Sequence, residues 1–145
     1  MPAEVLIDTG AILALLDKHD HWHAPCLHTF AQLRFPLLTS EAVLTETFHS
    51  IRRSRTEVEA VWGLIRSGAI MLASIDNQEL SRMNSLMTRY RDRPMDFADA
   101  TLVHLAERES IQVIFTVDQN DFATYRIAGR RRFQIIPVER PGFAL

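Results

Sequence analysis

The chain has 145 residues, of which 47% are hydrophobic, and a formal net charge of −2 at pH 7. This length fits one domain with a substantial core, so we expect a single domain over residues 1–145. No apolar run approaches the roughly 20 residues of a membrane span, and no basic region precedes the first apolar stretch, which disfavours membrane and secreted proteins. The single cysteine, Cys26, has no internal disulfide partner. We therefore expect a protein of the reducing cytoplasm that does not bind membranes.

The positive charges are almost all arginine, with Lys18 as the one lysine. Three groups stand close together in sequence: 52, 53 and 55; 89, 91 and 93; and 130 to 132. The planar guanidinium group suits contacts with phosphate. A solvated surface in an arginine-rich composition is an equally good interpretation of any one group, and the negative net charge argues mildly against simple binding to a nucleic-acid backbone.

The chain opens with Val5-Leu6-Ile7, an apolar run with β-branched residues that predicts a strand. Asp8-Thr9-Gly10 ends this strand, and apolar residues at helical spacing follow as far as Leu16. Asp20 is a good N-cap for a second helix that extends to about Leu33. The chain thus begins as a strand, an acidic turn and a pair of helices.

Strands and helices continue to alternate through the rest of the chain. The expected elements are a strand over 37–39, a helix over 40–51, a helix over 56–66, a strand over 69–73, a helix from 76 or 77 to 90, a helix from 96 to about 106, a strand over 113–116, a polar loop over 117–121 and a strand over 134–138. This alternation predicts an α/β sandwich with a mainly parallel central sheet.

Four carboxylates are candidates for one site. Asp8 and Asp118 follow two strands, and in a parallel sheet such strand ends share one edge, where sites form. Glu46 and Asp99 lie near helix starts that can face the same edge. Carboxylates that converge repel one another unless a cation or protons neutralise them. A hard divalent metal such as Mg²⁺ or Mn²⁺ prefers oxygen ligands and supports hydrolysis of phosphodiesters.

Each acid alone has a simpler explanation. Asp99 can be a helix-start charge favoured by the helix dipole, Asp118 a turn former, and Glu46 an exposed helix residue. The joint pattern favours a site, because all four acids point to one edge of the sheet.

The order of these motifs resembles that of the PIN domain, in particular the toxin half of VapBC toxin–antitoxin pairs. The motifs are Val5-Leu6-Ile7-Asp8-Thr9, Leu44-Thr45-Glu46, Asp99-Ala100-Thr101-Leu102 and Phe115-Thr116-Val117-Asp118-Gln119-Asn120-Asp121-Phe122. Each is weak alone, but their order and spacing together are fairly specific. The resemblance extends over essentially the whole chain.

The resemblance implies a three-layer α/β/α fold and a Mg²⁺- or Mn²⁺-dependent endoribonuclease that cleaves RNA. It implies Asp8, Asp99 and Asp118 as metal ligands, with Glu46 completing the catalytic set directly or through water. Thr116 would hydrogen-bond a ligand or a phosphate, and Asp121 would be a further acid of the loop. The resemblance also implies a cognate antitoxin and a homodimer.

Three departures from the family pattern bear on the site. Gly10 stands where the family often has serine, so a hydroxyl beside Asp8 is missing. The loop from Asp118 to Phe122 is one residue longer than the common pattern, which leaves open how Asp118 and Asp121 divide the work. Asp96 competes with Asp99 as a ligand, because it lies three residues earlier in the same helix region.

Two other classes remain as alternatives. Phosphotransfer proteins also place aspartates at strand ends, but Lys18 is in the wrong place for a receiver domain, and Gly10 occupies the position of the second aspartate of a haloacid-dehalogenase-like phosphatase. A non-catalytic PIN-fold scaffold, or a binding protein of RNA processing, would keep the fold without cleavage. The presence of all four acids argues against this second alternative.

Overall fold

The computed structural model describes residues 2–141, so Met1 and residues 142–145, at the two ends of the expected domain, lie outside the description. The elements are β1 (Val5–Ile7), α1 (Thr9–Leu16), α2 (His23–Phe30), β2 (Leu37–Ser40), α3 (Glu41–Ile51), α4 (Arg55–Arg66), β3 (Ile70–Ala73), the 3₁₀ turn η1 (Asn77–Glu79), α5 (Leu80–Arg89), α6 (Phe97–Glu109), β4 (Val113–Phe115), α7 (Gln119–Thr124), β5 (Arg126–Ile127), β6 (Arg131–Arg132) and β7 (Gln134–Ile136). No helix within residues 2–141 is long and apolar enough to cross a membrane.

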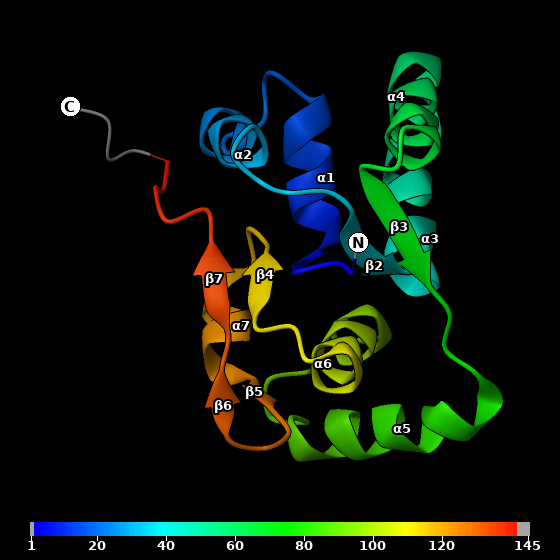
Figure 1. The fold of residues 1–145 in the computed structure, drawn as a ribbon, viewed down its shortest axis with the longest axis vertical. Coiled ribbons are helices and arrows are strands. Elements are labelled where there is room, and N and C mark those ends of the chain that lie inside the picture. Colours follow the sequence, from blue (N-terminus) through cyan, green and yellow to red (C-terminus); the bar gives the residue numbers. More distant parts are fainter. Residues whose placement is uncertain (1, 142–145) are drawn as a thin grey trace.

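The strands β3, β2, β1, β4 and β7 form one sheet in that order, and every neighbouring pair is parallel. In Figure 1, α1, α2 and α4 lie on one side of the sheet, while α5 and α6 lie on the other. The prediction of an α/β fold with helices on both faces of a parallel sheet is confirmed.

The core lies around β1, β4 and α6. All three residues of β1 are buried, as parallel strands covered on both faces require. Nine consecutive residues of α6, from Ala98 to Ala106, are buried, so this helix is enclosed on all sides. The enclosed helix fixes its first turn, which carries Asp99, against the edge of the sheet.

Some boundaries differ from the sequence-based expectation. The loop predicted over 117–121 is wrong in part, because α7 begins at Gln119 with Asp118 as its N-cap. The last strand ends at Ile136 and does not reach Val138, because Pro137 has no N–H to continue the ladder. The short antiparallel ribbon of β5 and β6 is an additional element that periodicity did not predict.

Candidate active site

The first pair of candidate residues stands at the ends of two adjacent strands. Ile7 pairs with Phe115 in register, so Asp8 and Thr116, the next residues of β1 and β4, lie side by side. The hydroxyl of Thr116 donates to Oδ2 of Asp8 at 3.0 Å, and the backbone N–H of Thr9 donates to Oδ1 at 2.8 Å. Both oxygens of the buried Asp8 carboxylate are therefore oriented by the protein.

Asp118 is tied to the same hydroxyl from the other side. Its backbone N–H donates to Oγ1 of Thr116 at 3.0 Å. Asp118 stands at the N-cap position of α7, but its side chain makes no capping hydrogen bond and is exposed. Thr116 thus links the strand ends that carry the two aspartates, and the carboxylate of Asp118 remains available for another partner.

Asp99 is buried in the first turn of α6. The hydroxyl of Tyr125, itself fully buried, donates to Oδ2 of Asp99 at 2.9 Å. Asp96 is the N-cap of this helix, and its Oδ1 accepts the backbone N–H of Asp99 at 2.8 Å. The two aspartates therefore have different environments, since Asp99 is held inside the fold while Asp96 is exposed at its surface.

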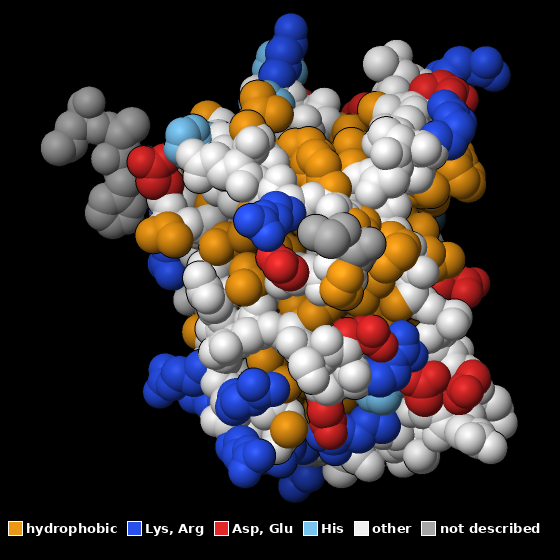
Figure 2. Space-filling model, in the orientation of Figure 1, with side chains coloured by type: hydrophobic (Ala, Val, Ile, Leu, Met, Phe, Trp, Pro, Cys, Tyr) orange, Lys and Arg blue, Asp and Glu red, His pale blue; other side chains and the backbone are white. Residues whose placement is uncertain are grey.

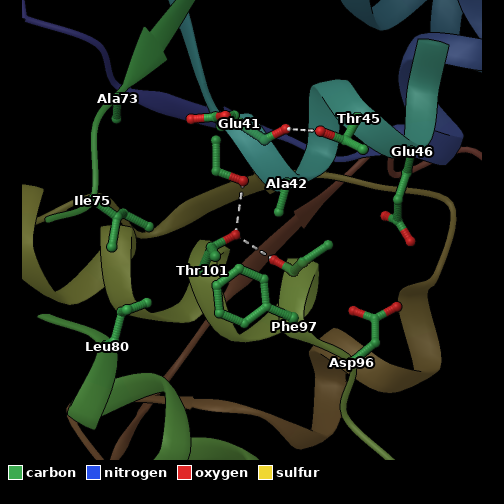
Figure 3. A pocket seen from close by; sticks show the side chains of 12 residues that line it. Glu41, Ala42, Thr45, Glu46, Ala73, Ile75, Leu80, Asp96, Phe97 and Thr101 are labelled. Carbon is green, nitrogen blue, oxygen red and sulfur yellow. Dashed lines mark hydrogen bonds between the residues drawn. The ribbon is translucent and has the colours of Figure 1, made fainter. Parts of the chain in front are cut away.

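Glu46 is carried by α3 and is connected to the strand-end acids through Thr9, the residue after Asp8. The hydroxyl of Thr9 lies 3.3 Å from Oε1 of Glu46 and donates to it. Glu46 and Asp96 line one cavity of about 550 Å³, together with residues of α3, α6 and the segment after β3. Figure 3 shows the two carboxylates facing each other across this cavity. Glu46 and Asp96 are therefore the two acids of the cluster that a ligand in this cavity would meet.

The carboxylates influence one another electrostatically. Burial raises the pKa of Asp8 to about 7, with smaller contributions from the charges of Asp118 and Asp96. Burial, followed by the charge of Asp8, raises the pKa of Asp99 to about 8. Partial desolvation also raises the pKa values of Glu46 and Asp118, and the charge of Asp96 adds to each increase. Since Asp96 contributes to all four increases, it belongs to the same cluster as the acids predicted from sequence.

Asp121 is in a different situation. Its Oδ1 forms an ion pair with Nη1 of Arg93 at 3.1 Å. Its charge nevertheless raises the pKa of Asp118, so it lies at the border of the cluster. The two acids of the longer loop thus differ in what they contact: Asp121 forms an ion pair with Arg93, while the carboxylate of Asp118 has no hydrogen-bond or ion-pair partner among residues 2–141.

The glycine beside Asp8 has a packing reason. A Cβ atom at Gly10 would lie 2.4 Å from Cγ2 of Val117, a β-branched side chain with little freedom to move. A serine at this position would collide with the segment that leads to Asp118. Val117 therefore explains why glycine, and not the serine common in the family, occupies position 10.

Sequence reasoning missed two residues that orient the acids. Tyr125 contacts Asp99, and Thr9 donates to Glu46 through its hydroxyl and to Asp8 through its backbone. Nothing in the spacing of Tyr125 relative to the acids predicts this contact. The only available signal is general, since a buried tyrosine hydroxyl needs a polar partner.

Within residues 2–141, no three side chains among histidine, cysteine, aspartate and glutamate are arranged to hold a metal ion as they stand. The oxygen donors are nevertheless of the kind that Mg²⁺ and Mn²⁺ prefer, and their raised pKa values mark negative charge that lacks compensation. Of the histidines in the run His19 to His23, the last binds the carbonyl of Ala14 through Nδ1 at 2.6 Å. That contact gives His23 a structural role between α2 and α1.

Comparisons with known proteins agree with this geometry. The PIN-domain family model matches residues 5–128. Ribonuclease VapC26 of Mycobacterium tuberculosis is 31% identical over 136 residues, which are 92% of this chain and 100% of that protein. The crystal structure of M. tuberculosis VapC20, described as a toxin that cleaves the sarcin–ricin loop, superposes with a TM-score of 0.70 at 23% identity and covers 81% of this chain and 93% of that one. The structure of PAE2754 from Pyrobaculum aerophilum superposes with a TM-score of 0.52 at 17% identity, covering 93% and 92% of the two chains. The chain therefore belongs to the PIN-domain family of nucleases and is a homologue of the VapC ribonuclease toxins.

Proposed function

We propose that this protein is an endoribonuclease dependent on Mg²⁺ or Mn²⁺, and that it hydrolyses RNA phosphodiesters at Asp8, Glu46, Asp99 and Asp118. The observation that carries the proposal is the pair of buried aspartates, Asp8 and Asp99. Burial raises the pKa of both carboxyls towards neutrality, and the charge of Asp8 raises the pKa of Asp99 further. A fold tolerates such a pair without protons only when a cation is present. The generally metal-dependent family to which the chain belongs supports this interpretation.

The metal would be held by Asp8, Asp99 and Asp118. When bound, such a cation stabilises charge on the scissile phosphate and lowers the pKa of a bound water. Asp118 has an exposed carboxylate without a capping bond, so it can turn toward the two buried aspartates at little cost. Asp96 is a further candidate ligand, because its charge acts on every other member of the cluster.

The surrounding hydroxyls set the orientation of the acids. Thr116 and the backbone of Thr9 fix both oxygens of Asp8, and Tyr125 fixes one oxygen of Asp99. Such oriented ligands require less reorganisation when a cation or a phosphate arrives. Glu46 faces the cavity, so it is placed to hold a water molecule or to accept a proton from it. Asp121, held by Arg93, is proposed as a border residue and not as a ligand.

We also propose that the protein is a toxin controlled by a cognate antitoxin, that it forms a homodimer and that it acts in the cytoplasm as a single nuclease domain over residues 1–145. The VapC homologues support the toxin assignment. Two exposed apolar side chains at the cavity, Leu80 and Phe97, support contact with another protein surface. Co-expression with the neighbouring reading frame and size-exclusion chromatography with light scattering test both partners.

The nuclease proposal is tested by cleavage of total cellular RNA by purified protein, with Mg²⁺ or Mn²⁺ against EDTA. We expect cleavage by the wild type only when the metal is present, and no cleavage by Asp99→Asn under any condition. Equal cleavage by the wild type and this variant would contradict the proposed site. The cut positions, read by sequencing the fragments, would then identify the RNA target.

A further inference from the structure

Two of the three arginine groups of the sequence come together in the folded chain. The first group begins with Arg89, the last residue of α5, and continues with Arg91 and Arg93 just after it. Nη2 of Arg89 donates to the backbone carbonyl of Gly129 at 3.4 Å. Gly129 immediately precedes the second group, Arg130 to Arg132, in the turn and second strand of the β5–β6 ribbon. Figure 2 shows the basic side chains gathered at the lower left, over this ribbon and the end of α5 in Figure 1.

The turn of the ribbon is built for this close approach. Ala128 and Gly129 both have positive φ angles, of 55° and 77°, and the N–H of Arg130 donates to the carbonyl of Ile127 at 3.2 Å. A Cβ atom at Gly129 would lie 3.1 Å from Nη1 of Arg89. Glycine therefore serves here both the left-handed conformation and the contact with the arginine.

The positive charges of these segments are mostly not neutralised. All six arginines are exposed, and among residues 2–141 the one ion pair that any of them forms joins Arg93 to Asp121. Arg132 stands directly opposite Arg126 in the ribbon, an arrangement of like charges that destabilises a strand pair. Arg126 is occupied by the carbonyls at the end of α7, to which its Nη1 donates. Folding stability therefore does not explain why arginine is concentrated here.

One end of the surface, at Arg93, adjoins the carboxylate cluster, while Arg132 lies beside Gln112 at the amino end of β4. Arg93 contacts Asp121, whose charge reaches Asp118. The hydroxyl of Tyr90, between the arginines of the first group, accepts the N–H of Arg126, next to the tyrosine that binds Asp99. A chain of phosphates that crosses the carboxylates would thus meet Arg93 first and would have to extend along the side of the fold to reach Arg130, Arg131 and Arg132.

We propose that Arg89, Arg91, Arg93, Arg130, Arg131 and Arg132 form a docking surface for the sugar–phosphate backbone of the RNA substrate beyond the scissile bond. This inference rests on the proposed nuclease function and adds where the RNA lies. Guanidinium groups bind phosphate oxygens in a bidentate manner. A shallow, open depression along α5, lined by Arg82, Asn84, Ser85, Thr88 and Arg89, continues this surface.

The test compares two variants that each remove three positive charges. Arg130→Gln/Arg131→Gln/Arg132→Gln lies on the docking surface. Arg52→Gln/Arg53→Gln/Arg55→Gln changes exposed arginines from the end of α3 to the start of α4, away from that surface. Binding of a fluorescein-labelled, mixed-sequence single-stranded RNA is followed by anisotropy in EDTA, where metal-dependent cleavage does not occur, at several salt concentrations. Thermal melting establishes that both variants are folded.

We expect the first variant to bind this RNA about tenfold more weakly, and its plot of log affinity against log salt to be less steep by about 2, as the loss of roughly three phosphate contacts predicts. The second variant should bind like the wild type. Equal weakening in both variants, no weakening in either, or no binding of the RNA by the wild type would overturn the proposal. A poly-glutamate peptide that binds as tightly as the RNA, with the same loss in the first variant, would also overturn it in favour of an acidic protein partner. Because these measurements need no cleavage, a failure of the docking surface is distinct from a failure of the nuclease site, which the Asp99→Asn comparison reports.

Discussion

The hydroxyl of Tyr125 donates a hydrogen bond of 2.9 Å to Oδ2 of Asp99, and both side chains are buried. The bond favours the charged form of Asp99 against the burial that raises its pKa. Tyr125→Phe should therefore raise the pKa of Asp99 further and lower both Mn²⁺ affinity and RNA cleavage by about 10- to 100-fold, as loss of a residue that orients a metal ligand usually does. Mn²⁺ titration and cleavage rates measure the two effects.

Tyr90→Phe is the matched control for this change. The ring of Tyr90 packs edge-on against that of Tyr125. Its hydroxyl accepts the backbone N–H of Arg126 and, within the described residues 2–141, bonds to no carboxylate. We expect a loss of about 1 kcal/mol in the free energy of unfolding and no change in Mn²⁺ affinity. A similar loss of Mn²⁺ affinity in both variants would show that packing, and not the bond to Asp99, is responsible.

Gly10→Ser restores the residue that is common in the family but should be harmful here. Its Cβ would lie 2.4 Å from Val117, so either α1 or the segment before Asp118 must shift. We expect the free energy of unfolding to fall by about 1–3 kcal/mol, as overpacking usually causes, and cleavage to fall with it. Val117→Ala removes the side chain that the serine would meet. The double variant Gly10→Ser/Val117→Ala should therefore be nearly as stable as Val117→Ala alone. Denaturant unfolding of the four proteins tests this, and a double variant no better than Gly10→Ser would refute the steric explanation.

The stability of the protein without metal should fall as the pH rises. The folded-state pKa values of Asp8 and Asp99, about 7 and about 8, lie above the value of about 4 in an unfolded chain. The folded state therefore binds more protons than the unfolded state between about pH 4 and pH 8. Their contribution is fully present below about pH 4 and is lost as the pH rises to about 8, at up to about 1.4 kcal/mol per pH unit for each carboxyl.

Denaturant unfolding in EDTA at pH 5.5 and pH 8 measures this effect. Asp99→Asn, which keeps an acceptor for Tyr125 but has no charge, should lose less stability than the wild type between the two pH values. Addition of Mn²⁺ to the wild type should restore stability at pH 8. Identical pH dependence in the wild type and Asp99→Asn would mean that the pKa of Asp99 is not raised in the folded state.

Much of the fold and the placement of the acids followed from the sequence, because both depend on local patterns. Apolar β-branched runs gave β1 and β4, and the rule that parallel strands end at one edge brought Asp8 and Asp118 together. The position of Asp96 in the cluster was harder to predict than its position at the start of α6. It depends on distances between elements and not on spacing along the helix.

Contacts between distant segments could not be predicted. Tyr125 reaches Asp99 only because β5 packs against α6, and two arginine groups meet only because the β5–β6 turn lies against the end of α5. Neither contact has a periodicity or a local motif. The helical α7 was missed for a related reason, since six residues give too short a pattern to distinguish a helix from a polar loop.

Mn²⁺ binding by the purified protein tests the central claim most directly, because it requires no knowledge of the RNA target. Electron paramagnetic resonance would measure free Mn²⁺ in titrations of the wild type, Asp8→Asn, Asp99→Asn and Asp121→Asn at pH 7.5. The account predicts saturable binding by the wild type, a loss of at least tenfold in affinity in Asp8→Asn and Asp99→Asn, and nearly unchanged binding in Asp121→Asn, whose carboxylate is paired with Arg93. Equal affinity in all four proteins, or no binding by the wild type, would contradict a metal site at this carboxylate cluster.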